Sequence, residues 1–77
     1  MNKKDVLDRY YLDCRCMLLE LAATLDRYDR TPVPPGDGRP ADERLLRIGQ
    51  AIAVLAQPSA EPNRTERILH LLSDPVV

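Results

Sequence analysis

The stretch from Asn2 to Arg30 contains neither glycine nor proline, and this feature restricts the fold of the chain more than any other. Asn2 is a residue type that often caps a helix, and Asp5 places a carboxylate in the first turn, where negative charge is favourable. We therefore predict one long helix over residues 2–30. At about 1.5 Å per residue it spans roughly 40 Å, which is typical of helical bundles rather than of an average helix of about 11 residues.

A loop follows this helix directly. Residues 31–40 read TPVPPGDGRP, and the four prolines and two glycines of this segment are incompatible with a continuing helix or strand. A second helix is predicted over residues 41–57, beginning near Pro40. Proline suits a first helical turn, and Asp42 and Glu43 place negative charge at the positive end of the helix dipole.

A third, shorter helix is predicted over residues 63–73. Pro58 ends the second helix, and Asn63 followed by Glu66 has the spacing of a capping box. The two shorter helices together are about as long as the first, so we expect them to fold back along it. The predicted fold is all-α, with one domain over residues 1–77. Its long N-terminal helix packs against two shorter antiparallel helices to form a three-helix bundle.

A first apolar stripe runs along the long helix, with its residues spaced alternately four and three apart. It consists of Leu7, Tyr11, Cys14, Leu18, Leu21, Leu25 and Tyr28. This heptad spacing is typical of coiled coils and predicts the face that meets the shorter helices, where Cys14 would be a small buried hydrophobe. The shorter helices carry apolar residues for this contact: Leu45, Ile48, Ile52, Leu55, Ile68, Leu69, Leu71 and Leu72.

A second apolar stripe lies on nearly the opposite side of the long helix. It consists of Leu12, Cys16, Leu19 and Ala23. A monomer would leave these residues in water, and four aligned apolar residues mark a contact surface more often than a solvated face. We therefore predict a homodimer that forms through the second stripe. Charged residues at i, i+4 spacing predict ion pairs towards both ends of the helix: Asp5, Arg9 and Asp13, and Asp26 with Arg30.

The size of the chain makes a second subunit plausible. A chain of 77 residues with 44% apolar residues is long enough for one globular domain, whose core seldom contributes more than about 3 to 5 kcal/mol. Cys14 and Cys16 are the only cysteines, and on a helix they point roughly 200° apart, so they cannot bridge each other. The net charge of −1 and the lack of an apolar leader or long apolar run predict a cytoplasmic protein without membrane contacts.

No residue cluster predicts catalysis, so we expect neither an enzyme nor a bound cofactor. His70 is the only histidine, and the sequence places no nucleophile beside it. Asp13 and Glu20 project from one face of the long helix, so a dimer could form a carboxylate metal-binding bundle. The Glu-x-x-His motif of such bundles is missing, which favours solvated surface carboxylates instead.

A nucleic-acid-binding regulator is the other alternative. Arg64 and Arg67 lie at the start of the third helix, in the place of a recognition helix. Glu66 lies between them and no basic stripe supports them, which argues against nucleic acid as a partner.

The segment LAATLDRYDR at residues 21–30 and the closing LLSDP at residues 71–75 resemble short uncharacterised bacterial helical proteins of similar size. The resemblance implies a bacterial cytosolic protein and carries no activity. From the second stripe and the lack of a catalytic cluster, we expect a non-catalytic module for protein–protein interaction or assembly. It would act as a homodimer and could also bind a further protein.

Overall fold

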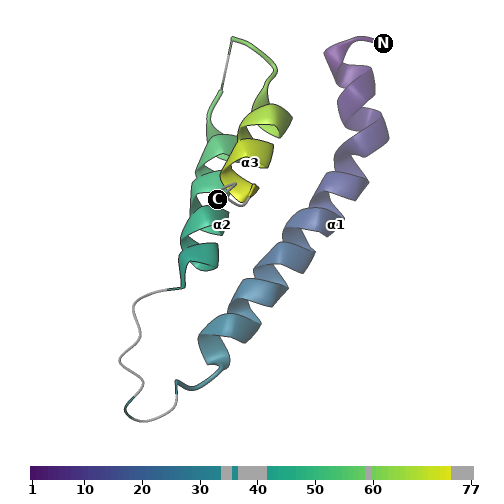
Figure 1. Ribbon diagram of the computed structural model, residues 1–77. Coiled ribbons are helices and arrows are strands. Elements are labelled where there is room, and N and C mark those ends of the chain that lie inside the picture. The colour runs from purple at the N-terminus through teal and green to yellow at the C-terminus, as the bar shows by residue number, and fades with distance from the viewer. Residues whose placement is uncertain (34–35, 37–41, 59, 74–77) are drawn as a thin grey trace. The chain divides into compact units, whose positions relative to one another are not determined.

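The computed structural model describes residues 1–33, 36, 42–58 and 60–73, and every regular element in these ranges is a helix. Figure 1 shows the three elements: α1 (Lys3–Arg30), α2 (Glu43–Ala56) and α3 (Arg64–Leu72). The all-α prediction is confirmed.

The chain divides into two compact units. Met1–Asp37 contains α1, and Gly38–Val77 contains α2 and α3. A single domain over residues 1–77 stays a prediction.

A reciprocal pair of hydrogen bonds fixes the start of α1. The side-chain oxygen of Asn2 accepts from the backbone N–H of Asp5 at 2.9 Å, and the Asp5 carboxylate accepts from the Asn2 N–H at 3.1 Å. This capping box satisfies donors that the helix itself leaves unpaired, and it confirms Asn2 as the N-cap. The helix ends where Thr31 takes up an extended backbone and donates its N–H to the Tyr28 carbonyl at 3.2 Å.

Of the loop predicted over residues 31–40, the structure describes residues 31–33 and Gly36. Gly36 has a φ of 81°, in the left-handed region that glycine adopts at little cost. Residues 34–35 and 37–40 lie outside the described part of the chain.

α2 begins at Glu43, two residues later than predicted. Asp42 has the extended backbone of an N-cap, with φ −63° and ψ 126°, and its carboxylate accepts from the backbone N–H of Arg44 at 2.9 Å. The Arg44 guanidinium donates to the same carboxylate at 2.7 Å. Asp42 is therefore the cap and not a residue of the first turn, and the predicted range 41–57 shortens at both ends.

The capping box predicted for α3 does not form. Asn63 is the N-cap, but its side chain makes no capping hydrogen bond and its backbone N–H donates to the Glu61 carbonyl at 2.9 Å. A capping box needs that N–H for the Glu66 carboxylate, so the turn before α3 removes the required donor. The Asn63 side-chain oxygen is buried without a hydrogen-bond partner among the described residues. α3 is correspondingly shorter than the predicted 63–73.

α2 and α3 pack against each other as a helical hairpin (Figure 1). Val54 is its one buried apolar side chain within the described ranges, at 7% exposed. The half-buried apolar residues of the described hairpin are Leu45, Ile48, Ala51, Ile68 and Leu71. On α2 the contact face therefore runs through Ile48, Ala51 and Val54.

This face differs from the one predicted for the second helix. That predicted face includes Ile52 and Leu55 and was assigned to the long helix. Both residues are exposed in the hairpin, as are Leu69 and Leu72 of α3, and their contact with the long helix stays a prediction. A shift of one position turns a helical side chain by about 100°, so burial of Ala51 and Val54 against α3 turns Ile52 and Leu55 out of that contact. The hairpin keeps an exposed apolar face of its own.

Two arginines of α3 tie the hairpin together at its closed end. Arg64 donates to the backbone carbonyl of Gln57 at 3.0 Å, and Arg67 donates to the side-chain oxygen of Gln57 at 3.3 Å. Gln57 is the C-cap of α2, where carbonyl groups lack partners within the helix. Both arginines therefore join the end of α2 to the first turns of α3.

Replacing Asn2 by alanine removes the acceptor of the α1 capping box. We expect α1 to lose about 1 kcal/mol of helix stability, because asparagine is among the best N-caps and alanine is among the poorest. Circular dichroism and amide exchange in the first turn measure the loss. Asn2→Asp is the matched control, since it keeps a side-chain acceptor. Equal first-turn protection in Asn2→Ala and the unmodified chain would contradict the capping role.

The Asp42 cap predicts a dependence of α2 on pH. Arg44 lowers the pKa of Asp42 from 3.8 to about 2, mainly through its side-chain hydrogen bond and next through its backbone N–H. The folded pKa is below the unfolded one. The charged cap therefore stabilises α2 fully above pH 3.8, and this contribution is lost as the pH falls towards 2.

Carbon-detected NMR titration of the Asp42 carboxyl group measures this pKa directly. We expect a midpoint near 2, and an Arg44→Gln variant should move it back towards 3.8. A midpoint of 3.8 in the unmodified chain would show that the ion pair does not hold in solution.

Candidate interaction surface

The second stripe lies along the middle of α1 and is open to solvent. Leu12 is 67% exposed and Leu19 is 54% exposed, and Cys16 and Ala23 are exposed as well. At about 100° per residue, the four side chains fall within roughly 60° of one another around the helix axis. All four residues predicted for the interface therefore share one exposed strip of α1.

The rest of α1 is also largely exposed. The helix is 28 residues long and none of its residues is buried. Leu21 and Leu25 of the first stripe are half-buried, whereas Leu7 and Leu18 are exposed. Cys14 was expected to be buried in the first stripe, but it is an exposed free thiol like Cys16. The prediction for Cys14 assumed that the shorter helices pack over the first stripe, and the unit that contains α1 has no such helix.

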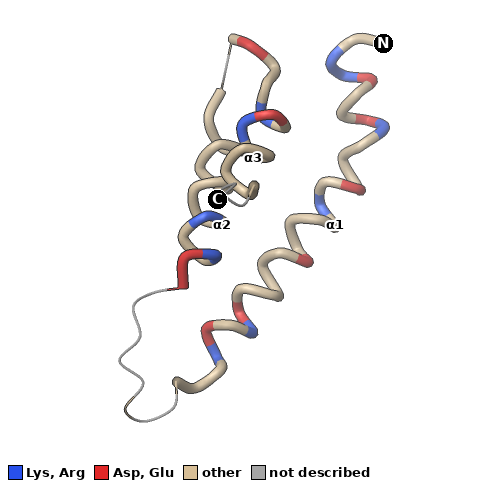
Figure 2. Tube along the Cα trace, viewed as in Figure 1, with Lys and Arg blue, Asp and Glu red and all other residues tan. Residues whose placement is uncertain are grey.

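Basic and acidic residues are interspersed along α1, as the blue and red segments of Figure 2 show. Near the N-terminal end, Lys4 and Asp8 form an i, i+4 ion pair at 2.9 Å, and Asp5 is occupied by the capping box. The Arg9 guanidinium lies 5.5 Å from the centre of the Tyr10 ring, within the range of a cation–π contact. The predicted ladder from Asp5 through Arg9 to Asp13 is therefore not the arrangement adopted.

Near the other end, the pair predicted between Asp26 and Arg30 is absent from the ion pairs among the described residues. Both side chains are exposed, and no hydrogen bond within the described part of the chain occupies either charge. These two charges are free to interact with another molecule.

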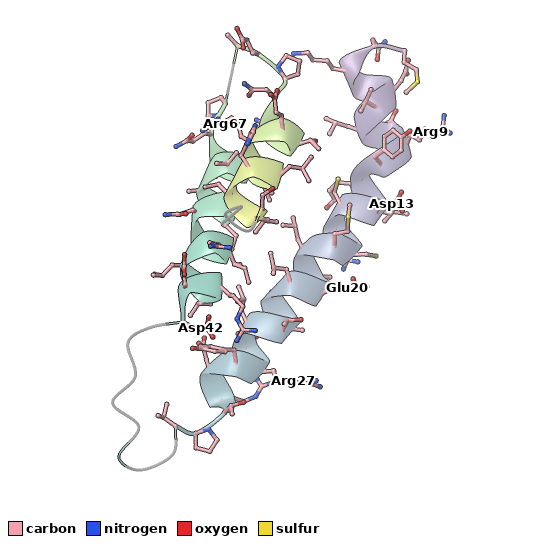
Figure 3. All side chains as sticks on the ribbon, in the orientation of Figure 1. Arg9, Asp13, Glu20, Arg27, Asp42 and Arg67 are labelled. Atoms are coloured by element: carbon pink, nitrogen blue, oxygen red, sulfur yellow. The ribbon has the colours of Figure 1, made fainter. Side chains whose placement is uncertain are left out.

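Asp13 and Glu20 follow one side of α1, together with Arg9 and Arg27 (Figure 3). Both carboxylates are exposed. Among the residues that the structure describes, no three His, Cys, Asp or Glu side chains come together as metal ligands. Within this part of the chain, Asp13 and Glu20 therefore belong to no cluster of three such side chains.

A shallow depression beside α3 is lined in part by Glu66, His70 and Ser73. These residue types make up hydrolytic triads, and their i, i+4, i+7 spacing, which ends at the C-cap Ser73, was not recognised from the sequence. The Ser73 hydroxyl donates to the Leu69 carbonyl at 2.6 Å, and no hydrogen bond within the described ranges joins His70 to Glu66 or Ser73. Without contact between nucleophile and base, the three residues form no activated nucleophile.

Arg64 and Arg67, the two residues behind the nucleic-acid alternative, both bind Gln57 of the hairpin. Arg67 is half-buried, and the apolar Ile68 and Leu71 of the same helix face α2. Each of the two guanidinium groups therefore makes a hydrogen bond within the hairpin, and Arg64 is exposed. The role of Gln57 as their common acceptor had no signal in the sequence.

Comparison with family models, curated proteins and solved structures yields no match for the chain. Within the described ranges, no helix combines the length and the apolar content that crossing a membrane requires.

Proposed function

We propose that this chain is a non-catalytic module for protein–protein interaction or assembly that acts as a homodimer. In this proposal, the α2–α3 hairpin packs on the first stripe of α1 and completes a three-helix bundle. The second stripe of one copy packs on the second stripe of another. The observation that carries the proposal is that α1 buries none of its residues although it has two apolar stripes.

The energetics of helices in water support a covered α1. An isolated helix is only marginally stable, because most helical stability in proteins comes from packing an apolar face. The hairpin has the same need, since Val54 alone is buried in its described part and a unit of about 40 residues rarely folds on so little core. Each unit therefore exposes apolar side chains that would be buried by packing against the other unit.

The assignment of one stripe to each partner follows from their lengths. The first stripe extends from Leu7 to Tyr28, which suits the exposed apolar face that the hairpin presents at Ile52, Leu55 and Leu69. The second stripe is shorter and lies on nearly the opposite side. A helix cannot turn both sides to the same hairpin, so the second stripe is left for another copy.

Substitution of Leu19 by lysine tests the proposal. Burial of a leucine side chain contributes about 1.5 to 3 kcal/mol, and a symmetric dimer buries Leu19 twice. We therefore expect Leu19→Lys to weaken the dimer by about a hundredfold or more. Sedimentation equilibrium of the full chain over a range of concentrations measures the change.

Leu46→Lys is the matched control, because Leu46 of α2 is 56% exposed and belongs to neither stripe. It should leave the dimer intact, and circular dichroism should show both variants to be helical. A monomer at high micromolar concentration in the unmodified chain would overturn the proposal. So would equal dimerisation of the two lysine variants.

A further inference from the structure

We propose that the two copies meet antiparallel along α1, with Cys16 opposite the partner's Leu19 and Leu12 opposite the partner's Ala23. This inference rests on the proposed homodimer and specifies its partner and its orientation. Two independent features of the second stripe carry it. One is the order of charges at the ends of the stripe, and the other is the order of large and small side chains within it.

Charged residues extend the second stripe in both directions with the same spacing of three and four. Arg9 and Asp5 precede Leu12, and Asp26 and Arg30 follow Ala23. All four charged residues fall on the same side of α1 as the stripe, since the heptad spacing continues without a break. Along the chain, the strip therefore reads acidic, basic, apolar centre, acidic, basic.

When the second copy runs in the opposite direction, each charged residue of this strip lies opposite a residue of the other sign. In the antiparallel alignment, Arg9 lies opposite the partner's Asp26 and Asp5 lies opposite the partner's Arg30. The twofold axis repeats both pairs, because each contact in a symmetric dimer occurs twice. In a parallel alignment each residue meets itself, so all four layers bring like charges together. Such self-complementarity fits a second copy rather than an unrelated partner.

The charges are available for these contacts. Asp26 and Arg30 are exposed and unpaired within the described part of the chain. Arg9 lies over the Tyr10 ring and forms no ion pair there, while Asp5 retains acceptor capacity beside its single bond to the Asn2 N–H.

The sizes of the apolar residues agree with the same alignment. Large and small side chains alternate along the stripe, as Leu12, Cys16, Leu19 and Ala23. The antiparallel alignment puts one leucine and one small residue in every layer, so the two helices keep an even separation. A parallel alignment stacks leucine on leucine and alanine on alanine, which leaves gaps at the small layers. Facing positions that combine large and small residues fill space best.

Residues that flank the stripe carry less weight. The antiparallel dimer brings Asp13 beside the partner's Glu20, whereas a parallel one pairs Arg15 with the partner's Glu20 and sets Asp8 beside the partner's Asp13. These positions stay solvated at the edge of the interface, where ion pairs contribute little. The four charged layers that extend the stripe, at Asp5, Arg9, Asp26 and Arg30, therefore decide the orientation.

Disulfide trapping tests the orientation in the full chain. Two cysteines can be bridged only when their Cα atoms lie within roughly 7 Å. In a parallel dimer Cys16 faces the partner's Cys16, whereas in the antiparallel dimer the two are offset by three residues, about 4.5 Å along the axis. The antiparallel dimer instead places Cys16 within reach of the partner's position 19.

Two proteins are prepared: Cys14→Ser, which keeps only Cys16, and Cys14→Ser/Cys16→Ser/Leu19→Cys with a tag that changes its size. After mild oxidation we expect a covalent dimer only when the two are mixed, and only between a tagged and an untagged chain. Covalent dimers of either protein alone would overturn the antiparallel orientation and leave the homodimer standing.

Sedimentation equilibrium of the same samples separates the two claims. A dimer that forms no disulfide in any mixture would overturn the placement of the second stripe on the dimer axis. A monomer of the unmodified chain would overturn the homodimer itself.

A charge exchange provides a second, non-covalent test. Arg9→Glu sets like charges against the partner's Asp26 at two places, so we expect the dissociation constant of the dimer to rise about tenfold. Adding Asp26→Arg restores opposite charges and should return the constant to within about threefold of the original value. A parallel dimer would respond to neither change, and circular dichroism monitors the helix in both variants.

Discussion

Burial of the apolar sides of α1 is the constraint on which the rest of this structure depends. A helix of 28 residues with two apolar stripes and no buried residue has no source of packing energy within its own unit. Its N-terminal cap fixes where it begins, but the cap and the surface ion pair each contribute too little to replace a core. The fold and the proposed function therefore share one physical origin, the burial of these stripes.

The hairpin illustrates the same constraint on a smaller scale. Its closure relies on polar contacts at Gln57, where Arg64 and Arg67 bind, and on a narrow apolar contact around Val54. The face that bears Ile52 and Leu55 stays open. Both units thus leave apolar side chains exposed, and the bundle that we propose buries them against each other. The proposed bundle leaves the second stripe exposed. The order of charges at the ends of this stripe favours a second copy as the partner that buries it.

The sequence predicted a helix boundary well where that boundary has a strong local cause. The absence of glycine and proline from Asn2 to Arg30, and the prolines after it, determine α1 almost to the residue. Predictions failed where a neighbouring element competes for the same group. Asn63 has the spacing of a capping-box residue, but the Glu61 carbonyl accepts from its N–H. The contact of α2 with α3 through Ala51 and Val54 was not predicted, because the heptad spacing was read as a face for the long helix. Of the candidate surface, the residues of the stripe were found by periodicity, whereas the use of Arg64 and Arg67 in closing the hairpin depends on a tertiary contact that no spacing encodes.

Amide hydrogen exchange of the full chain at several concentrations tests the central claim most directly. If a second copy covers the second stripe, protection of the amides around Leu12, Cys16 and Leu19 rises with protein concentration, because dimerisation stabilises by mass action. Protection around Val54 in the hairpin should rise far less with concentration. Protection of α1 that is the same at every concentration would contradict the account, because α1 would then owe none of its stability to another copy.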